Sequence, residues 1–186
     1  MKYFERMKRN FDVAPLLEEI SSVPKAWDLA TGRQDKIRVQ REAKAIPVRG
    51  IVKSKIQGRK RRDVHESRWT STSTSFPRAR KFLEDLAAET NSELSRGKIV
   101  LLPPGRRVHP HIDRGEYYRL RNRYHLILQS AAGSWMRAGD EEVRMQAGEL
   151  WWFDNDQVHE AHNDGELDRI HFIFELLPRE RLALIA

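Results

Sequence analysis

Residues 148–176 read GELWWFDNDQVHEAHNDGELDRIHFIFEL. The stretch contains three short apolar runs, at 150–153, 158–161 and 169–176, and Gly, Asn and Asp residues that favour turns separate them. Short runs of this kind, rich in aromatic and β-branched side chains, are typical of β-strands. We therefore expect three strands in this part of the chain.

The same pattern extends toward the N-terminus. Apolar runs at 99–102, 124–128 and 142–145 precede the quoted stretch, and glycines lie between the runs. Six strands within residues 98–176, with turn signals between them, indicate an antiparallel sandwich or barrel and argue against βαβ units. The second part of the chain therefore predicts a mainly β fold.

Residues 1–97 have a mixed character with two helical patterns. Apolar side chains from Val13 to Ile20 recur at the spacing of an amphipathic helix, and a second such pattern follows Pro77, whose fixed backbone angle suits a helix start. A further run at 45–52 reads as a strand. We expect flanking helices in front of a β-core.

The length of 186 residues fits one domain, so we expect residues 1–186 to form a single unit. Within it, residues 1–97 would be the mixed front half and residues 98–176 the β-core. No apolar run approaches the ~18 residues of a membrane span, and the charged residues 1–9 are not followed by an apolar stretch of signal-peptide length. The expected location is therefore the cytoplasm, with no membrane partner.

Composition and charge limit the chemistry. The chain has no cysteine, so any metal must be held by nitrogen and oxygen ligands. Lys and Arg total 34 against 27 Asp and Glu, and the net charge of +7 favours acidic partners. The excess is densest in residues 53–62, the basic segment, which holds six of these cations. Two interpretations stay open: a solvated loop, or a surface that binds an acidic peptide or nucleic acid.

His111, Ile112 and Asp113 place an imidazole and a carboxylate two residues apart, and in an extended chain such residues project from the same face. A second imidazole from another strand would complete the set of two histidines and one carboxylate that characterises non-haem iron(II) oxygenases. His159, at the start of an expected strand, is the best candidate for it. His109 is the substitute.

Arg169 stands at the head of the most apolar expected strand, where a permanently charged guanidinium is costly without a partner. A dianionic cofactor would provide that partner. The alternative is an edge arginine that pairs with Asp168 or Glu166.

Arg123 and His125 share one face of the run at 124–128. In a closed barrel both side chains would point toward the metal. They would serve there either as carboxylate-binding groups or as structural ones.

Six motifs occur in order: Leu102-Pro103-Pro104-Gly105, Pro110-His111-Ile112-Asp113, Arg123-Tyr124-His125-Leu126, Gly148-Glu149-Leu150-Trp151-Trp152-Phe153-Asp154, His159-Glu160 with Asn163, and Arg169-Ile170-His171. Together they resemble the aspartyl/asparaginyl β-hydroxylase family of 2-oxoglutarate oxygenases, strongly over residues 99–175. The resemblance implies a double-stranded β-helix, the jelly-roll core that cupins also have, for residues 98–176.

The resemblance implies a ligand set for iron(II): His111, Asp113 and His159. Asp113 bears on the reaction, because halogenating relatives of such oxygenases vacate this position so that chloride can bind. The animal enzymes that name the family also lack this carboxylate, whereas this chain keeps it. The complete set therefore implies hydroxylation, with oxygen as co-substrate.

The resemblance also implies 2-oxoglutarate as a cofactor. Arg169 would bind its distal carboxylate, and His125 and Arg123 would contact its other end. One departure is Glu175, where the family usually has Asp. The chain is also short for the family, so substrate specificity must come from the front half and the loops.

We therefore expect an Fe(II)- and 2-oxoglutarate-dependent dioxygenase that hydroxylates an amino-acid carbon, in Asp or Asn of a peptide or in a free amino acid. An acidic peptide would suit the basic segment. Two alternatives are a non-catalytic cupin-like scaffold that binds a metal or a small acid, and a zinc hydrolase, which would not require Arg169. A nucleic-acid substrate is disfavoured, because Trp151 and Trp152 lie in an expected core strand and offer no stacking platform.

Overall fold

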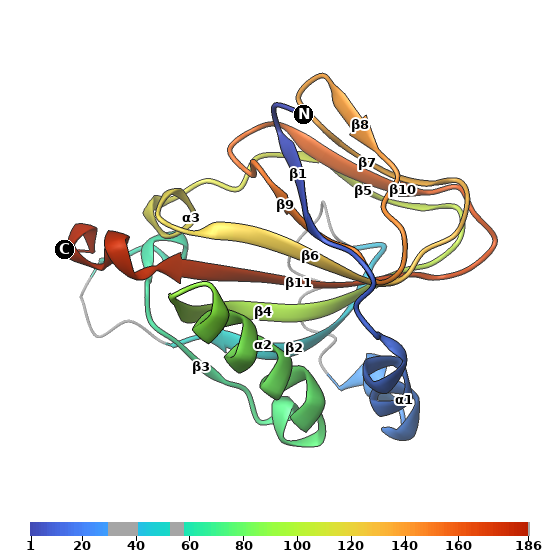
Figure 1. Ribbon diagram of the computed structural model, residues 1–186, viewed down its shortest axis with the longest axis horizontal. Helices are drawn as coiled ribbons and strands as arrows, with labels where there is room; N and C mark the ends of the chain where they lie inside the picture. The colour runs from blue at the N-terminus through green and yellow to red at the C-terminus, as the bar shows by residue number, and fades with distance from the viewer. Residues whose placement is uncertain (30–40, 53–57, 186) are drawn as a thin grey trace.

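The computed structural model describes residues 1–29, 41–52 and 58–185 (Figure 1). These residues form two antiparallel sheets, one with the strand order β1-β9-β6-β11-β4-β2-β3 and the other with the order β5-β10-β7-β8. No helix among them is long and apolar enough to cross a bilayer.

The strands are β1 (Phe4–Lys8), β2 (Lys44–Ile51), β3 (Ser67–Trp69), β4 (Ser92–Leu102), β5 (Arg106–His111), β6 (Asn122–Gln129), β7 (Ser134–Ala138), β8 (Glu141–Val143), β9 (Leu150–Phe153), β10 (His159–Asn163) and β11 (Arg169–Pro178). The helices are α1 (Ala14–Ser22), α2 (Pro77–Glu89) and α3 (Glu116–Arg119), with 3-10 turns at Ala26–Asp28, Arg61–Asp63, Thr72–Ser75 and Arg179–Leu184.

The two sheets pack against each other mainly through one apolar cluster. Phe4, Trp151 and Phe153 come from the larger sheet, and Met136 and Ala161 come from the smaller one. Successive strand residues point to opposite faces, so each strand of the larger sheet sends alternate side chains into this space. The space between the sheets therefore holds both a core and room for a site.

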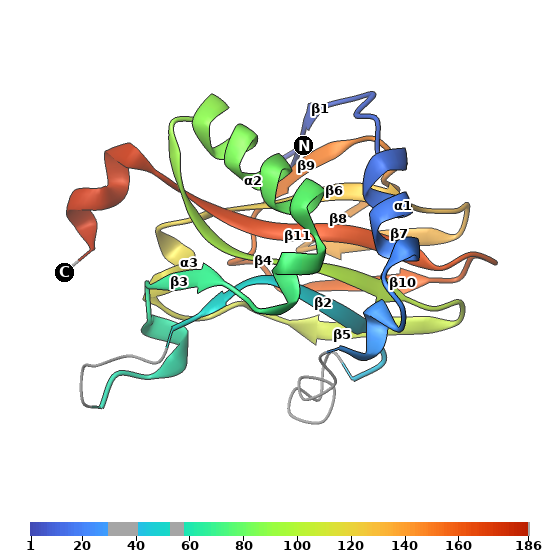
Figure 2. The ribbon, with the colours of Figure 1, turned by 90° about the horizontal axis from the view of Figure 1, so that it is seen from below.

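The outer face of the larger sheet is covered by α1 and α2, which Figure 2 shows lying across its strands. Ile170, Phe172 and Phe174 of β11 are buried in this second core together with Ala79 and Leu83 of α2. Pro77 occupies the first turn of α2, as predicted, where its missing N–H costs nothing. β11 is buried on both faces, and apart from Arg169, His171 and Glu175 its residues are apolar.

The structure adds strands that the sequence pattern did not predict. In the β-rich part these are β5 and β7, and the run expected at 142–145 is the shorter strand β8. In the front half, β1 and β3 form the two edges of the larger sheet. Edge strands are commonly short and charged, and β1 buries only Phe4, so neither has the apolar alternation of an inner strand. The front half is therefore not simply helical.

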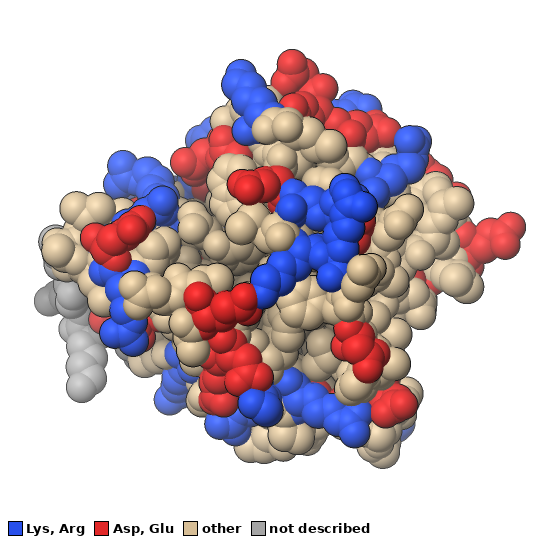
Figure 3. Space-filling model, in the orientation of Figure 1, with Lys and Arg blue, Asp and Glu red and all other residues tan. Residues whose placement is uncertain are grey.

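The basic segment lies partly outside the described residues, because Lys53 and Lys55 are not among them. Its end, the turn Arg61–Asp63, packs against the start of α3, where Asp63 Oδ1 accepts a hydrogen bond from the Glu116 amide at 3.1 Å. Gly115 permits this approach, since a Cβ there would lie 2.6 Å from the Arg62 carbonyl oxygen. Basic and acidic side chains are interspersed over the face seen in Figure 3.

Candidate active site

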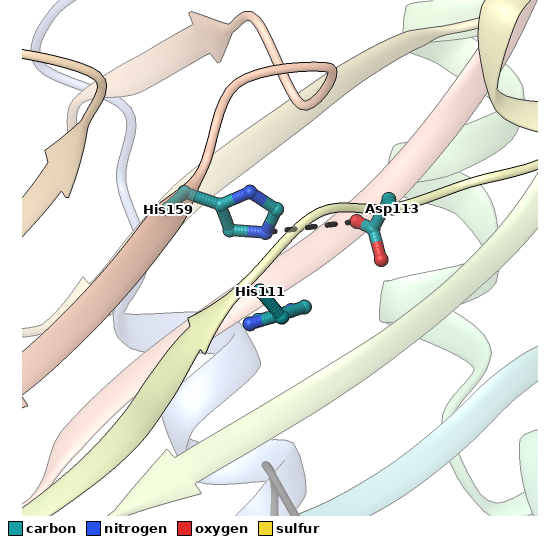
Figure 4. Close-up of side chains that lie close together, drawn as sticks. All are labelled: His111, Asp113 and His159. Atoms are coloured by element: carbon teal, nitrogen blue, oxygen red, sulfur yellow. Dashed lines mark ion pairs between the residues drawn. The ribbon is translucent and has the colours of Figure 1, made fainter.

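The predicted metal ligands come from two neighbouring strands of the smaller sheet. His159 opens β10 and lies directly opposite His111, the last residue of β5, in the strand register. Asp113 follows two residues later in the chain. One ligand atom from each of the three residues lies within 4.8 Å of the other two, and Figure 4 shows the His159 ring directed toward Asp113 with the His111 ring beside them. The structure therefore brings the three predicted ligands together.

Hydrogen bonds determine which ring nitrogen of each histidine is available. His111 Nδ1 donates to the His109 carbonyl at 2.8 Å, and His159 Nδ1 donates to the Gln157 carbonyl at 2.9 Å. A carbonyl can only accept, so each Nδ1 carries the proton and each neutral ring keeps a lone pair on Nε2. Burial lowers the pKa of His159 to about 4, although the Asp113 carboxylate opposes this. Both rings thus offer metal-binding nitrogens.

Asp113 is one end of a buried chain of charged groups. Burial raises its pKa, but the Arg123 guanidinium and the two histidines outweigh this and hold the pKa below its usual value. Arg123 Nη1 donates to Asp113, while its Nε and Nη2 donate to Glu175 at 3.0 and 2.6 Å. Glu175 also accepts from the Tyr117 hydroxyl at 3.2 Å. Asp113 therefore remains a carboxylate, and Arg123 is held from both sides.

Arg169 is buried at the head of β11, with 3% of its surface exposed. No hydrogen-bond acceptor or carboxylate for its guanidinium is found in the part of the chain that the structure describes. The alternative partners Asp168 and Glu166 do not pair with it. Burial alone lowers the pKa of Arg169 to about 9. Such a group is costly unless something else binds to it.

One cavity between the sheets connects these groups. Its lining includes His111, His159, Arg123, His125 and Arg169. Apolar side chains such as Val100, Met136 and Ile173 form other parts of its wall. The cavity thus has nitrogen ligands and cations on its wall, and apolar surface between them.

Comparison with known proteins identifies the family. A family model described as aspartyl/asparaginyl β-hydroxylase matches residues 55–178, well over half of the chain. The chain belongs to the aspartyl/asparaginyl β-hydroxylase family. Family membership makes it a 2-oxoglutarate-dependent hydroxylase, and the recognition and enzyme class predicted from the sequence are confirmed. A search of curated proteins gives no match.

Solved structures of oxygenases share the fold. A prolyl-4-hydroxylase from Pseudomonas putida is similar with a TM-score of 0.54 at 17% identity, covering 95% of this chain and 92% of its own. A 2OG-Fe(II) oxygenase-family oxidoreductase from Burkholderia pseudomallei has a TM-score of 0.51 at 10% identity, covering 93% and 94%. The predicted jelly-roll core is confirmed, and iron(II) and 2-oxoglutarate are the cofactors that this class uses.

Other histidines of this β-hydroxylase family member lie away from the cavity. His109 Nε2 contacts Glu42 Oε1 at 3.0 Å, and His162 stacks on Trp135 with ring centroids 4.1 Å apart. His109, the substitute candidate for the second imidazole, is therefore not part of the cluster of ligand atoms, and neither is His162.

Two residues of the site were not assigned a role from the sequence. Glu175 pairs with Arg123, which it faces in the β11–β6 register. His171 has its Nδ1 3.2 Å from the Nδ1 of His125. The polar side chains of Arg169 and His171 on one face of β11 indicated that this face belongs to a site. Their partners depend on a strand register that the sequence alone does not reveal.

Proposed function

We propose that the chain hydroxylates an amino-acid carbon with iron(II) held by His111, Asp113 and His159 and with 2-oxoglutarate held by Arg169. One observation carries the proposal: Arg169 is a fully buried cation without a partner in the described residues, and it lines the same cavity as both metal-binding imidazoles. A dianionic cofactor that reaches from the metal to Arg169 would bind the metal with one end and pair with the Arg169 guanidinium at the other.

The donor set suits iron(II). Two imidazole lone pairs and one carboxylate, without any thiolate, match the ligand type of non-haem iron oxygenases, and three protein ligands leave positions open. When bound, iron(II) and 2-oxoglutarate activate oxygen to hydroxylate a C–H bond, with succinate and carbon dioxide as the other products.

The chain's own residues bind and orient the reactants. Arg169 binds the distal carboxylate of 2-oxoglutarate by a charge-assisted hydrogen bond, the strongest kind available in a buried site. His125, with Arg123, lies on the cavity wall where the opposite end of the cofactor would sit. The apolar wall, including Val100 and Ile173, excludes water from the cavity.

For the substrate we propose an Asp or Asn side chain in an acidic peptide, with a free amino acid as the alternative. The family description supports an Asp or Asn substrate. The basic segment supports a peptide, because its end, Arg61–Asp63, packs beside Gly115, two residues after Asp113. The end of the segment therefore meets the chain two residues beyond Asp113, and its net positive charge favours acidic chains.

Anaerobic titration of the metal-free protein with iron(II) and 2-oxoglutarate tests the cofactor assignment. The expected result is the weak visible absorption of a keto acid bound to iron(II), which Arg169→Met weakens. Arg121→Met is the matched control, because Arg121 is also a buried arginine but its guanidinium donates hydrogen bonds to Ser95, His65 and Tyr117. The control should leave the absorption unchanged.

Absence of the band with any keto acid would refute the cofactor assignment and favour a scaffold or a hydrolase. If the band forms, succinate release in a screen of acidic peptides, free amino acids and single-stranded nucleic acid identifies the substrate. Release stimulated only by nucleic acid would refute the peptide proposal.

A further inference from the structure

His125 and His171 form a buried pair on neighbouring strands. Their Nδ1 atoms lie 3.2 Å apart, from β6 and β11 of the larger sheet. His125 lines the cofactor cavity, whereas His171 is not part of that wall. His171 Nε2 is buried and has no hydrogen-bond partner in the described part of the chain. The hydrogen bond between the two rings therefore determines the tautomer of both histidines.

Both rings are neutral. Burial, reinforced by the nearby charge of Arg169, lowers the pKa of His125 and of His171 well below the usual value. A neutral imidazole carries one proton, on Nδ1 or on Nε2. A hydrogen bond between two Nδ1 atoms requires a proton on one of them and a lone pair on the other. The two outer Nε2 atoms must then be opposite: one is an N–H donor and the other is a lone pair.

One observation and one requirement of the proposed function favour the proton on His171 Nδ1. With that arrangement, the unpartnered Nε2 of His171 is an acceptor, and buried acceptors without partners are less rare than buried donors without partners. The arrangement also gives His125 an Nε2–H. A carboxylate can only accept, so a donor is what the cavity wall must present to the end of 2-oxoglutarate near the metal.

We propose that His171 is a positioning residue that donates its Nδ1 proton to His125 and so fixes His125 as an Nε2–H donor toward the cofactor carboxylate. The proposal rests on the proposed function, because it needs a carboxylate beside His125. It gives His171 a role without contact to metal, cofactor or substrate.

Two variants test the role of His171. His171→Asn keeps a side-chain N–H that can donate to His125 Nδ1, whereas His171→Leu keeps the bulk and removes the donor. The dissociation constant of 2-oxoglutarate is measured anaerobically with iron(II), and that of the metal alone is measured separately. We expect His171→Leu to raise the dissociation constant of 2-oxoglutarate by about tenfold or more, which is the effect of losing one hydrogen bond to a charged group. Metal affinity should change little, and His171→Asn should restore most of the loss.

The tautomer is read directly by long-range proton–nitrogen NMR of the zinc(II)-loaded, histidine-labelled protein, because zinc is diamagnetic. The wild type should show His125 protonated on Nε2 and His171 on Nδ1, and His171→Leu should lose this single form. The reverse tautomers, or an unchanged 2-oxoglutarate dissociation constant in His171→Leu, would overturn the role of His171 alone. If the wild type shows the expected tautomers but binds no keto acid, the proposed function is overturned instead. The proposed hydrogen bond from His125 Nε2–H to the cofactor carboxylate is then overturned as well.

Discussion

Replacing Arg169 with Met should make the metal-free protein more stable. Arg169 is buried with no partner among the described residues, so the folded state bears the cost of desolvating its charge. Methionine retains the aliphatic volume and removes the charge. Most substitutions of buried residues destabilise, and a gain in stability here would identify a residue kept for binding.

The size of the gain follows from the pKa of Arg169, which burial lowers from 12.5 to about 9. A fall of about 3.5 units corresponds to a cost of roughly 5 kcal/mol at about 1.4 kcal/mol per unit. Imperfect packing of the new side chain opposes this, so we expect a gain of about 2 kcal/mol in the free energy of unfolding. Because the pKa is lowered in the folded state, the cost is fully present below pH 9 and fades as pH rises above it. The gain should therefore be constant between pH 6 and pH 8.

Urea unfolding of the metal-free proteins, followed by tryptophan fluorescence, measures the difference. Arg121→Met is the control, and it should lose about 2 kcal/mol or more, because it leaves Ser95, His65 and the Tyr117 carbonyl without their donor. With iron(II), 2-oxoglutarate at about 100 times its dissociation constant should add about 2.7 kcal/mol to the wild type and almost nothing to Arg169→Met.

The reasoning would be refuted if Arg169→Met were less stable than the wild type by as much as Arg121→Met. It would also be refuted if 2-oxoglutarate stabilised Arg169→Met as much as the wild type. The first result would mean that Arg169 has a structural partner, and the second that the cofactor binds elsewhere.

Three further predictions concern the metal ligands, Glu175 and the basic segment. His111→Ala, Asp113→Ala and His159→Ala should each abolish succinate release and reduce the bound iron, and full activity in His159→Ala would contradict its assignment as a ligand. Glu175→Gln should lower the free energy of unfolding by about 3 kcal/mol, because Arg123 loses one of the two buried carboxylate charges that neutralise it; unchanged urea midpoints would disprove this pairing. Changing Arg59, Lys60 and Arg62 together to Gln should raise the KM for an acidic peptide several-fold at low salt and leave 2-oxoglutarate binding unchanged. Equal KM values for the two proteins at low salt would show that the basic segment is only solvated surface.

The strongest predictions from the sequence were those made by periodicity. On β11, Ile170, Phe172 and Phe174 pack under the helices, while Arg169 and His171 face the other sheet. A two-residue repeat determines this division whatever the neighbouring strands are. The same repeat placed His111 and Asp113 near each other.

Pairings between distant strands could not be predicted in this way. The contact of Arg123 with Glu175 depends on the β11–β6 register, which shifts between Ile170 and His171. A shift of one residue moves every later side chain to the other face, and no local pattern marks where it occurs. β1 was missed for a different reason: it buries only Phe4, so its stability comes from pairing with β9 and not from its own composition.

The charges of the site explain why a metal and a dianion suit it together. Arg123 and Arg169 contribute two positive charges, and Asp113 and Glu175 contribute two negative ones, so these four groups balance one another. Arg123 is neutralised at short range by both carboxylates, whereas Arg169 is not, and the balance is therefore uneven in space. A divalent cation at the imidazole end and a dicarboxylate extending to Arg169 add no net charge and correct that unevenness. Either one alone would leave a charge of two units in a low-dielectric cavity, which is the costliest state available to it.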